Sequence, residues 1–422
     1  MGTRITVVGG GSTYTPELVE GFARRSARLP IDELVLLDTD PDRLDVVGGL
    51  AQRMLDKLDW PGRLLLTGDR DAALDGSDFV LFQLRVGGQA ARLVDETLPL
   101  RFGVIGQETT GAGGFAKAMR TVPVVLDLAE LVGRRSAPDA WIVDFTNPVG
   151  IVTQALLDEG HRAIGLCNVG ITLQRRMAAH FGVEPERVEL EHVGLNHLTW
   201  ERAVRVDGVD RLPELLSAHV ELLAGELRLP ADMIRMIGAI PSYYLRYYYL
   251  TRTVLQEQQA GHTRARDVMD IEARLLELYR DQSLAEKPAL LDDRGGAFYS
   301  EAAAQLIASL HDGAGDIQVV DVRNDGAIPD LADSAVVEVP ARIDRDGAHP
   351  LPLTPLAPEQ RGLVQAVKAY EELTVAAART GDRVLAERAL SANPLVGAEI
   401  AHPLLEAILE GDREHLARFA AV

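Results

Sequence analysis

Short apolar runs, each followed by a segment with helical spacing, dominate the first 165 residues of the chain. The runs are "RITVVGG", "ELVLLD", "RLLLTGD", "DFVLFQL", "AWIVDFT" and "RAIGLC". They lack the polar alternation of a half-exposed sheet, which indicates parallel strands covered on both faces. The pattern predicts an α/β fold with a Rossmann-type, doubly wound parallel sheet over residues 1–165.

Beyond residue 165 the pattern becomes mixed. "RVELEHVGLNHLTWERAVRVDG" predicts strands, and "LPADMIRMIGAIPSYYLRYYYLTRTVLQEQ" has helical spacing broken at Pro241. "DIQVVDVRNDGAIPDLADSAVVEVPARI" returns to strands, and the tail from about Pro358 is helical. Residues 166–422 are therefore predicted to form a mixed α+β second lobe. Ligands bind at the carboxyl ends of parallel strands and between lobes, so we expect the site near residue 165.

The first predicted strand runs into a glycine-rich turn, "VVGGGSTYTPELVEGF". Glycines between a strand and a helix let the backbone approach a pyrophosphate, whose charge sits at the helix N-terminus. The third glycine of the usual fingerprint is replaced by Tyr14. The turn predicts dinucleotide binding, and its candidate residues are Gly9, Gly11, Ser12 and Thr13.

Two residues near the end of the second predicted strand bear on the choice between NAD and NADP. Asp38 ends that strand in "LVLLDTD", where a carboxylate can accept hydrogen bonds from the adenosine ribose hydroxyls. This favours NAD over NADP. Arg43 could pack over the adenine, reach a 2′-phosphate, or be a solvated arginine at a helix start.

Composition and charge narrow the classes of partner. The formal net charge of −20 disfavours nucleic acid and anionic membranes, so local arginines would have to hold an anionic ligand. No uncharged apolar run reaches the roughly 18–20 residues that a membrane-spanning helix needs. One cysteine in 422 residues and a strand-like start, "MGTRITVVGGG", lead us to expect a cytoplasmic protein.

That cysteine, Cys167, lies in "AIGLCNVGI", where a buried strand meets a polar residue. Its thiolate and the imidazole of His197 in "HVGLNHLTW" could bind a divalent metal, with substrate supplying the other ligands. Taken alone, the residues favour a small core cysteine and a structural histidine over a metal site. His192 precedes His197 by an odd offset, so in an unbroken strand the two face opposite ways and do not share one ion.

The segment "GAIPSYYLRYYYL" carries five tyrosines. An aromatic helix face in the core explains most of them. A tyrosine can also act as a base where nearby positive charge lowers its pKa, and a metal ion could supply that charge.

Together these motifs are similar to those of a known family. They are "VGGGSTYTPELVEG", "RVGGQAARLVDETLPLRFGVIGQETTGAGGFAKAMRTVPV", "DFTNPVGIVT", "GLCNVGI", "HVGLNHLTW", "IPSYYLRYYY" and "NDGAIPDLADSAVVEVP". The chain resembles glycoside hydrolase family 4, the NAD- and manganese-dependent glycosidases, over nearly its whole length. The resemblance implies a Rossmann-type fold like that of lactate and malate dehydrogenases, and a hydrolysis outside the scheme of two carboxylates.

The resemblance also implies roles for the site residues. Cys167 and His197 match the metal ligands, usually of Mn²⁺. Tyr244 matches the catalytic base, with Tyr243 as the neighbour to be distinguished from it. Glu108 of "QETTG" matches an acid thought to raise the basicity of that base. The expected reaction passes a hydride from carbon 3 of the sugar to NAD⁺, removes the carbon 2 proton, expels the aglycone, adds water and returns the hydride.

Four further residues match substrate contacts of the family: Asn147, Asn168, Arg92 and Arg264, with Arg264 as the expected phosphate clamp. Members acting on α-linked phosphoglucosides resemble "CD" after the metal cysteine, and β-acting members carry "CN"; this chain reads "CN". The resemblance therefore implies a 6-phospho-β-glucosidase acting on a phosphorylated disaccharide or aryl glucoside. Gly170 and Ala112 stand where the family often has proline, so we expect the local loop geometry to differ there.

Other functions remain open from the sequence. Within the family, the substrate could be a phospho-α-glucoside or an unphosphorylated hexoside or uronide. An NAD-dependent 2-hydroxy-acid dehydrogenase on the same fold would need neither metal nor Cys167, and a non-catalytic NAD-binding sensor would need no base. Relatives in the family are dimers or tetramers, so we expect a homodimer or homotetramer whose interface involves the second lobe.

Overall fold

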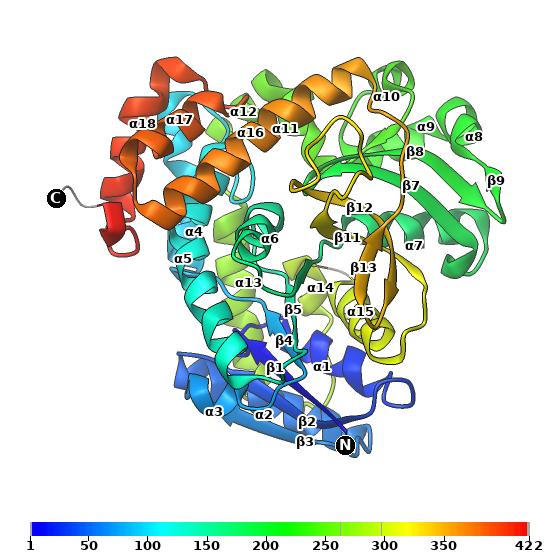
Figure 1. The fold of residues 1–422 in the computed structure, drawn as a ribbon, viewed down its shortest axis with the longest axis vertical. Coiled ribbons are helices and arrows are strands. Elements are labelled where there is room, and N and C mark those ends of the chain that lie inside the picture. Colours follow the sequence, from blue (N-terminus) through cyan, green and yellow to red (C-terminus); the bar gives the residue numbers. More distant parts are fainter. Residues whose placement is uncertain (1, 262, 297, 420–422) are drawn as a thin grey trace.

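A nine-stranded sheet runs through the centre of the computed structural model, which describes residues 2–261, 263–296 and 298–419 (Figure 1). Its order is β13-β12-β11-β6-β5-β4-β1-β2-β3, and β1 to β6 are parallel. The order β3-β2-β1-β4-β5-β6 is that of the dinucleotide-binding fold. All six apolar runs form strands, as predicted. The parallel strands are β1 (Thr3–Val8), β2 (Ile31–Leu37), β3 (Arg63–Thr67), β4 (Phe79–Phe82), β5 (Trp141–Asp144) and β6 (Ala163–Gly165).

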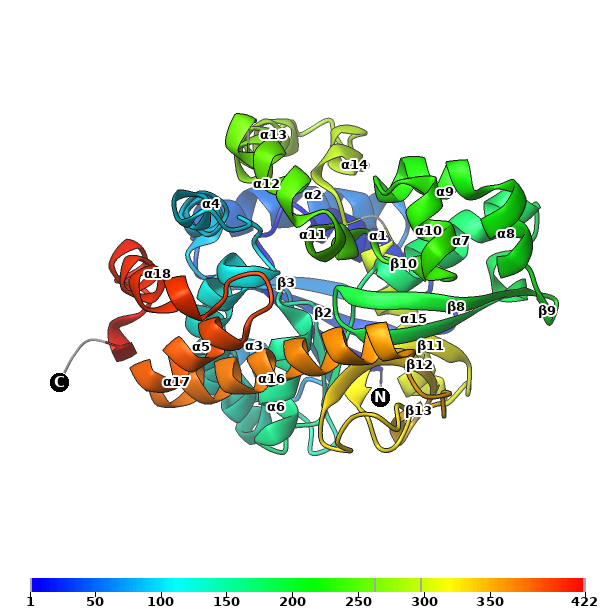
Figure 2. The ribbon, with the colours of Figure 1, turned by 90° about the horizontal axis from the view of Figure 1, so that it is seen from above.

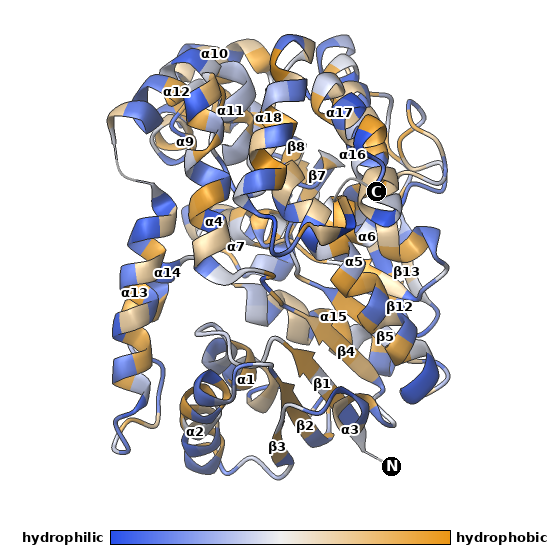
Figure 3. Ribbon diagram, turned by 90° about the vertical axis from the view of Figure 1, so that its left-hand side faces the viewer, coloured by the Kyte–Doolittle hydropathy of each residue, from blue (hydrophilic) through white to orange (hydrophobic). Residues whose placement is uncertain are grey.

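Helices cover both faces of these strands, which explains why the runs are continuously apolar (Figure 3). One face carries α1 (Thr15–Ala23) and α2 (Pro41–Lys57), with α15 (Tyr299–Asp312) packed on α1. The other carries α3 (Arg70–Leu74), α5 (Gly111–Arg135) and α6 (Val149–Asp158). Between β4 and α5 lie α4 (Gly88–Thr97) and η1 (Pro99–Phe102). The predicted doubly wound architecture is confirmed.

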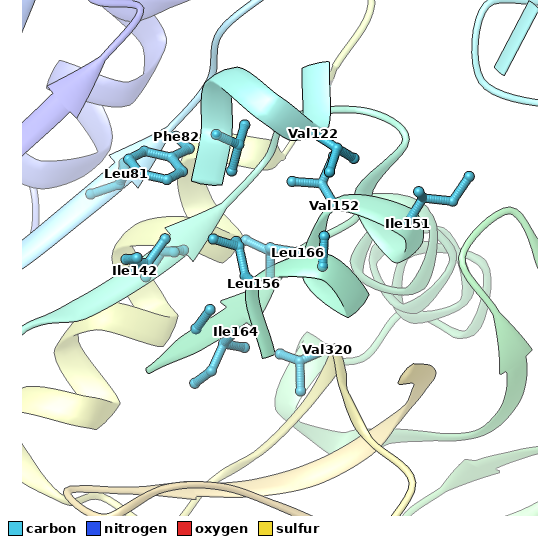
Figure 4. Packing of buried hydrophobic residues seen from close by; sticks show 14 of the residues in the cluster. Leu81, Phe82, Val122, Ile142, Ile151, Val152, Leu156, Ile164, Leu166 and Val320 are labelled. Atoms are coloured by element: carbon cyan, nitrogen blue, oxygen red, sulfur yellow. The ribbon is translucent and has the colours of Figure 1, made fainter. Parts of the chain in front are cut away.

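The core lies between the parallel strands and the helices that cover them (Figure 4). Leu81, Ile142 and Ile164 come from three neighbouring strands and share one buried cluster with Val122 of α5 and Leu156 of α6. Full burial of such a side chain contributes roughly 1.5–3 kcal/mol. This packing fixes the carboxyl ends of the strands, where the candidate site lies.

Three strands from the last third of the chain extend the sheet beyond β6. They are β11 (Ile317–Arg323), β12 (Val336–Asp344) and β13 (Gly347–Pro350), and they pair antiparallel. The strands predicted there are confirmed, but they continue the sheet of the first 165 residues. The central sheet thus draws on both expected domains, and the boundary at residue 165 stays a prediction.

A smaller antiparallel sheet stands beside the large one. It contains β7 (Val188–Leu195), β8 (Leu198–Val206), β9 (Val209–Asp210) and β10 (Ile240–Pro241). Around it lie α7 (Val169–Phe181), η2 (Pro185–Arg187), α8 (Leu212–Ala218), α9 (Val220–Leu227) and α10 (Ala231–Ile237). The broken helical segment is η3 (Tyr243–Leu245), α11 (Arg246–Tyr249) and α12 (Thr251–Ala260).

The remaining helices flank the molecule on opposite sides (Figure 2). On one side α13 (Arg264–Tyr279) and α14 (Leu290–Arg294) lie by α2; on the other lie α16 (Pro358–Thr380) and α17 (Arg383–Ala392), followed by α18 (Ala398–Gly411) and η4 (Ala417–Phe419). The helical tail begins at Pro358, as predicted. Among the described residues, no helix has both the length and the apolar composition to cross a membrane.

Candidate active site

A cavity of about 1360 Å³ opens at the carboxyl ends of the parallel strands. It is larger than the usual site of one small ligand, roughly 300–1,000 Å³, and extends from the glycine-rich turn to the tyrosine segment and α13. Three predicted site residues lie behind its wall: Thr13, Cys167 and His197. The others line it: Gly9, Gly11, Ser12, Asp38, Arg43, Arg92, Glu108, Asn147, Asn168, Tyr244 and Arg264.

The glycine-rich turn is tight and faces the cavity. Gly9 has a φ of +90°, and a Cβ added there would lie 2.8 Å from the carbonyl oxygen of Gln83. Only glycine fits this position. The amide of Gly11 donates to Asp38 Oδ2 at 2.8 Å, and Oδ1 accepts from the amide of Asp40 at 3.0 Å. A glycine turn that lines the cavity between a strand and a helix fits the pyrophosphate of a dinucleotide.

Glu272 of α13 joins the turn to the second half of the chain. Arg43 donates to the carbonyl of Gly11 at 3.2 Å and lies 3.6 Å from Glu272, so it is fixed on the turn and not freely solvated. Thr13 Oγ1 lies 3.4 Å from Glu272 Oε1, and the carbonyl of Thr13 accepts from the Tyr279 hydroxyl at 2.7 Å. Thr13 therefore anchors α13 and does not face the cavity. Sequence reasoning missed Glu272 because no motif surrounds it.

The two candidate metal ligands come from different sheets. Cys167 follows β6, and His197 lies in the hairpin turn between β7 and β8 with a φ of 62°. His197 Nδ1 lies 3.0 Å from the Thr109 hydroxyl, which leaves Nε2 for a ligand. The Tyr299 hydroxyl, a contact that no motif predicts, lies 3.9 Å from Cys167 Sγ at the cavity wall.

The protonation state of His197 suits a metal ligand, whereas Cys167 would need the cation itself to become a thiolate. Burial lowers the pKa of His197 to about 4, so its imidazole is neutral near pH 7, as a metal ligand must be. Burial raises the pKa of the Cys167 thiol well above its ordinary value, and a nearby cation would favour the thiolate. The described residues contain no group of three or more His, Cys, Asp or Glu that could hold a metal. A bound substrate or water could supply further ligands.

Tyr244 is distinguished from Tyr243 by its neighbour. Its ring stacks on His197, with centroids 3.7 Å apart and planes 8° apart. The Tyr243 hydroxyl instead accepts from Arg246 at 3.0 Å. Burial, followed by the nearby Cys167, raises the pKa of Tyr244 well above its ordinary value. Tyr244 thus needs an adjacent positive charge before it can act as a base.

Glu108 lies at the centre of a buried charge cluster. It accepts from Arg85, from Lys117 Nζ at 2.7 Å, and lies 3.2 Å from Arg92. Burial opposes ionisation, but these three cations hold the pKa of Glu108 well below its usual range. A permanent negative charge therefore lies near Tyr244 and contributes to its raised pKa. Lys117 stands within a quoted motif, "GGFAKAMRTVPV", yet nothing in its spacing marked it.

The predicted substrate residues surround the remaining part of the cavity. Asn147 Oδ1 is buried and has no hydrogen-bond partner within the described ranges, so it can accept from a bound hydroxyl. Asn168 stands at the residue before the first turn of α7 and lines the cavity. Arg264 begins α13 and donates through one terminal nitrogen to the carbonyls of Asp293 and Arg294, at 2.7 and 3.2 Å. Arg92 is already held by Glu96 at 2.8 Å.

The two departures from the family pattern are both packed against the sheet region. A Cβ at Gly170 would lie 2.9 Å from Val319 Cβ, so β11 approaches α7 too closely for a larger residue. Ala112 is buried in the first turn of α5. Neither change removes a polar group from the cavity.

Comparison with known proteins agrees with this fold. The model of the family 4 glycosyl hydrolases matches residues 4–183, and that of their C-terminal domain matches residues 192–396. A probable 6-phospho-beta-glucosidase of Bacillus subtilis is 41% identical over 99% of this chain and 98% of its own.

Solved structures give the same result. The 6-phospho-beta-glucosidase of Thermotoga maritima, solved with manganese, NAD⁺ and glucose 6-phosphate, has a TM-score of 0.93 and 37% identity, covering 98% of this chain and 99% of its own. A malate dehydrogenase of Plasmodium falciparum shares the fold, with a TM-score of 0.56 at 15% identity, over 89% of this chain and 98% of its own.

The fold and the cavity define an enzyme with a Rossmann-type fold, the fold that it shares with a malate dehydrogenase. Within that class, the chain belongs to glycoside hydrolase family 4 and is a glycoside hydrolase. The family and the fold class expected from the sequence are confirmed.

Proposed function

We propose that this protein hydrolyses 6-phospho-β-glucosides with NAD⁺ and a divalent metal ion, normally Mn²⁺, as cofactors. The observation that carries the proposal is that the same cavity is lined by a dinucleotide-type glycine turn and by Tyr244, which stacks on His197. Relatives named 6-phospho-beta-glucosidase support the same substrate. The site would lie in a cytoplasmic homodimer or homotetramer.

The glycine turn and Asp38 would hold NAD⁺, and Cys167 with His197 would hold the metal ion. When bound, NAD⁺ supplies an acceptor for the hydride of carbon 3, and the metal ion polarises the carbonyl oxygen formed there. Tyr244 would remove the proton on carbon 2, because its ring lies directly against the metal-binding imidazole.

Two further groups of the chain would orient the sugar. Asn147 Oδ1 is aligned as an acceptor for a sugar hydroxyl, because burial leaves it otherwise unpaired. Arg264 keeps one terminal nitrogen without an acceptor among the described residues and lines the cavity, so it would hold the 6-phosphate. Asn168 would favour the β-linkage, as its "CN" motif implies.

The test is hydrolysis of p-nitrophenyl 6-phospho-β-glucoside against its α-linked and its unphosphorylated counterpart. Each substrate is assayed under reducing conditions with and without NAD⁺ and with and without Mn²⁺. Cleavage of the phosphorylated β-substrate alone, and only with both additions, is expected.

Each other outcome of this assay would point to a different alternative function. Cleavage of the α-linked or unphosphorylated substrate with both additions would keep the reaction class and overturn the roles of Asn168 or Arg264. Net accumulation of NADH from a 2-hydroxy acid, with no glycoside cleaved and no need of metal, would replace the proposal by a dehydrogenase.

A further inference from the structure

Behind the cavity, one buried histidine bridges two glutamates. His192 Nδ1 lies 2.6 Å from Glu201 Oε1, and Nε2 lies 2.8 Å from Glu338 Oε1. The second oxygen of Glu338 accepts from the side-chain amide of Asn196 at 2.7 Å. All three ionisable side chains are almost completely buried, His192 at 0%, Glu338 at 1% and Glu201 at 2% exposure. None of the four residues lines the cavity.

This bridge joins the two sheets. His192 and Glu201 face each other across β7 and β8 of the small sheet, and Glu338 belongs to β12 of the large one. A register shift between Leu190 and His192 creates the pairing, because a regular continuation from the Leu190–Val204 pair would bring His192 opposite Arg202. The chain therefore places a carboxylate opposite this histidine through a local irregularity of the hairpin.

Each end of the bridge is connected, through the chain or through strand pairing, to one candidate metal ligand. Asn196 directly precedes His197 in the hairpin turn. On the other side, Glu338 is the cross-strand partner of Asp321, and Asp321 is the cross-strand partner of Gly165, two residues before Cys167. Glu338 is thus connected by side-chain hydrogen bonds to the hairpin that carries His197, and by the pairing of β12, β11 and β6 to the strand end that carries Cys167.

We infer that His192, Glu201, Glu338 and Asn196 are positioning residues that fix the separation of Cys167 and His197 and so set the affinity of the site for a divalent cation. This inference rests on the metal site of the proposed function. It follows from the topology, because the two ligands come from sheets that share no backbone pairing.

The charge state of the bridge supports this role. Although burial opposes it, the two carboxylates raise the pKa of His192 to about 10, so the imidazolium is the form present near pH 7. A charged hydrogen bond at each ring nitrogen resists displacement more than a neutral one. Both nitrogens are occupied, so His192 orients the site and does not ligate the ion itself.

The test measures Mn²⁺ binding directly. Full-length protein, reduced and saturated with NAD⁺, is titrated with Mn²⁺, and the free ion is followed by its electron paramagnetic resonance signal. His192→Gln is expected to weaken Mn²⁺ binding by about 10- to 100-fold, the usual effect of losing an outer partner of a metal ligand. The affinity for NAD⁺, measured by fluorescence, should stay within about twofold, because His192 does not touch the glycine turn.

The direction of the change in Mn²⁺ affinity distinguishes a positioning role from a purely electrostatic effect. Removing the imidazolium leaves two glutamates uncompensated, so electrostatics alone would tighten Mn²⁺ binding. A tightened or unchanged affinity in His192→Gln would overturn the inference. Asn196→Ala supplies a second variant with no change of charge, for which about a tenfold weakening is expected, and full affinity would also overturn it.

A matched control removes a buried carboxylate elsewhere. In Asp412→Asn the carboxylate that lies 3.1 Å from Arg120, away from both ligands, becomes a neutral amide, and Mn²⁺ affinity should stay unchanged. An equal loss of Mn²⁺ affinity in this variant would mean that general destabilisation explains the result. If the unsubstituted protein binds no Mn²⁺, the metal site of the proposed function fails as well, whereas binding that is the same in all variants refutes only the positioning role.

Discussion

Replacement of Tyr244 by phenylalanine tests the proposed base with the least disturbance. The substitution removes one oxygen and keeps the ring on His197, where the centroids are 3.7 Å apart. Within the described residues the Tyr244 hydroxyl makes no hydrogen bond, so its loss should change the free energy of unfolding by less than about 1 kcal/mol. Loss of a general base lowers the rate by about 10²- to 10⁴-fold, which corresponds to about 3–5 kcal/mol in the barrier.

The assay compares kcat of Tyr244→Phe with that of Tyr243→Phe, using p-nitrophenyl 6-phospho-β-glucoside at saturating NAD⁺ and Mn²⁺. Tyr243→Phe loses the same oxygen one residue away, but that oxygen accepts from Arg246, so it should cost about 1 kcal/mol of stability and less than fivefold in kcat. Deuterium at carbon 2 should slow Tyr244→Phe further, because proton removal becomes the slow step.

Retention of more than a tenth of the wild-type kcat by Tyr244→Phe would refute the assignment. A large loss in Tyr243→Phe alone would move the base to the neighbouring residue.

Two further predictions concern the substrate and the core. Arg264→Ala should raise KM for the phosphorylated substrate at least tenfold and leave Mn²⁺ affinity unchanged in steady-state assays, since the guanidinium lines the cavity; an unaltered KM would exclude the phosphate role. Burial raises the pKa of Asp144 from 3.8 to about 8, so the folded state holds a proton that the unfolded chain releases over this range. Wild-type stability should therefore fall as pH rises from 5 to 8, by at most about 1.4 kcal/mol per unit, whereas Asp144→Asn should lack this component. Urea denaturation at both pH values checks this, and parallel changes in the two proteins would contradict it.

The fold of the first 165 residues follows from sequence because local signals agree there. Six apolar runs specify parallel strands, and the glycine turn marks the carboxyl edge. The addition of β11 to β6 could not be predicted, because it depends on pairing between Gly165 and Asp321, far apart in the chain. A strand pattern gives the existence of a strand but not its neighbour.

The site residues likewise fall into those that sequence motifs mark and those that only the structure reveals. Residues within recognisable motifs, such as Tyr244 and Glu108, were found, and the structure brings them to one cavity. Tyr299 and Glu272 were missed, because each acts through a contact with a residue more than a hundred positions away. The sequence separates His192 from His197 as a ligand candidate, but the two glutamate partners of His192 depend on a register shift that no pattern of residue types reveals.

The return of β11, β12 and β13 to the central sheet has a consequence for biosynthesis. The glycine turn and its strands leave the ribosome early, yet the outer edge of β6 has no partner until residues 317–323 have been made. Until then a nascent chain presents an open strand edge, which is a template for association with other chains. The central sheet is therefore completed last, and a ribosome that stalls before residue 350 would release an aggregation-prone fragment and not a smaller working enzyme.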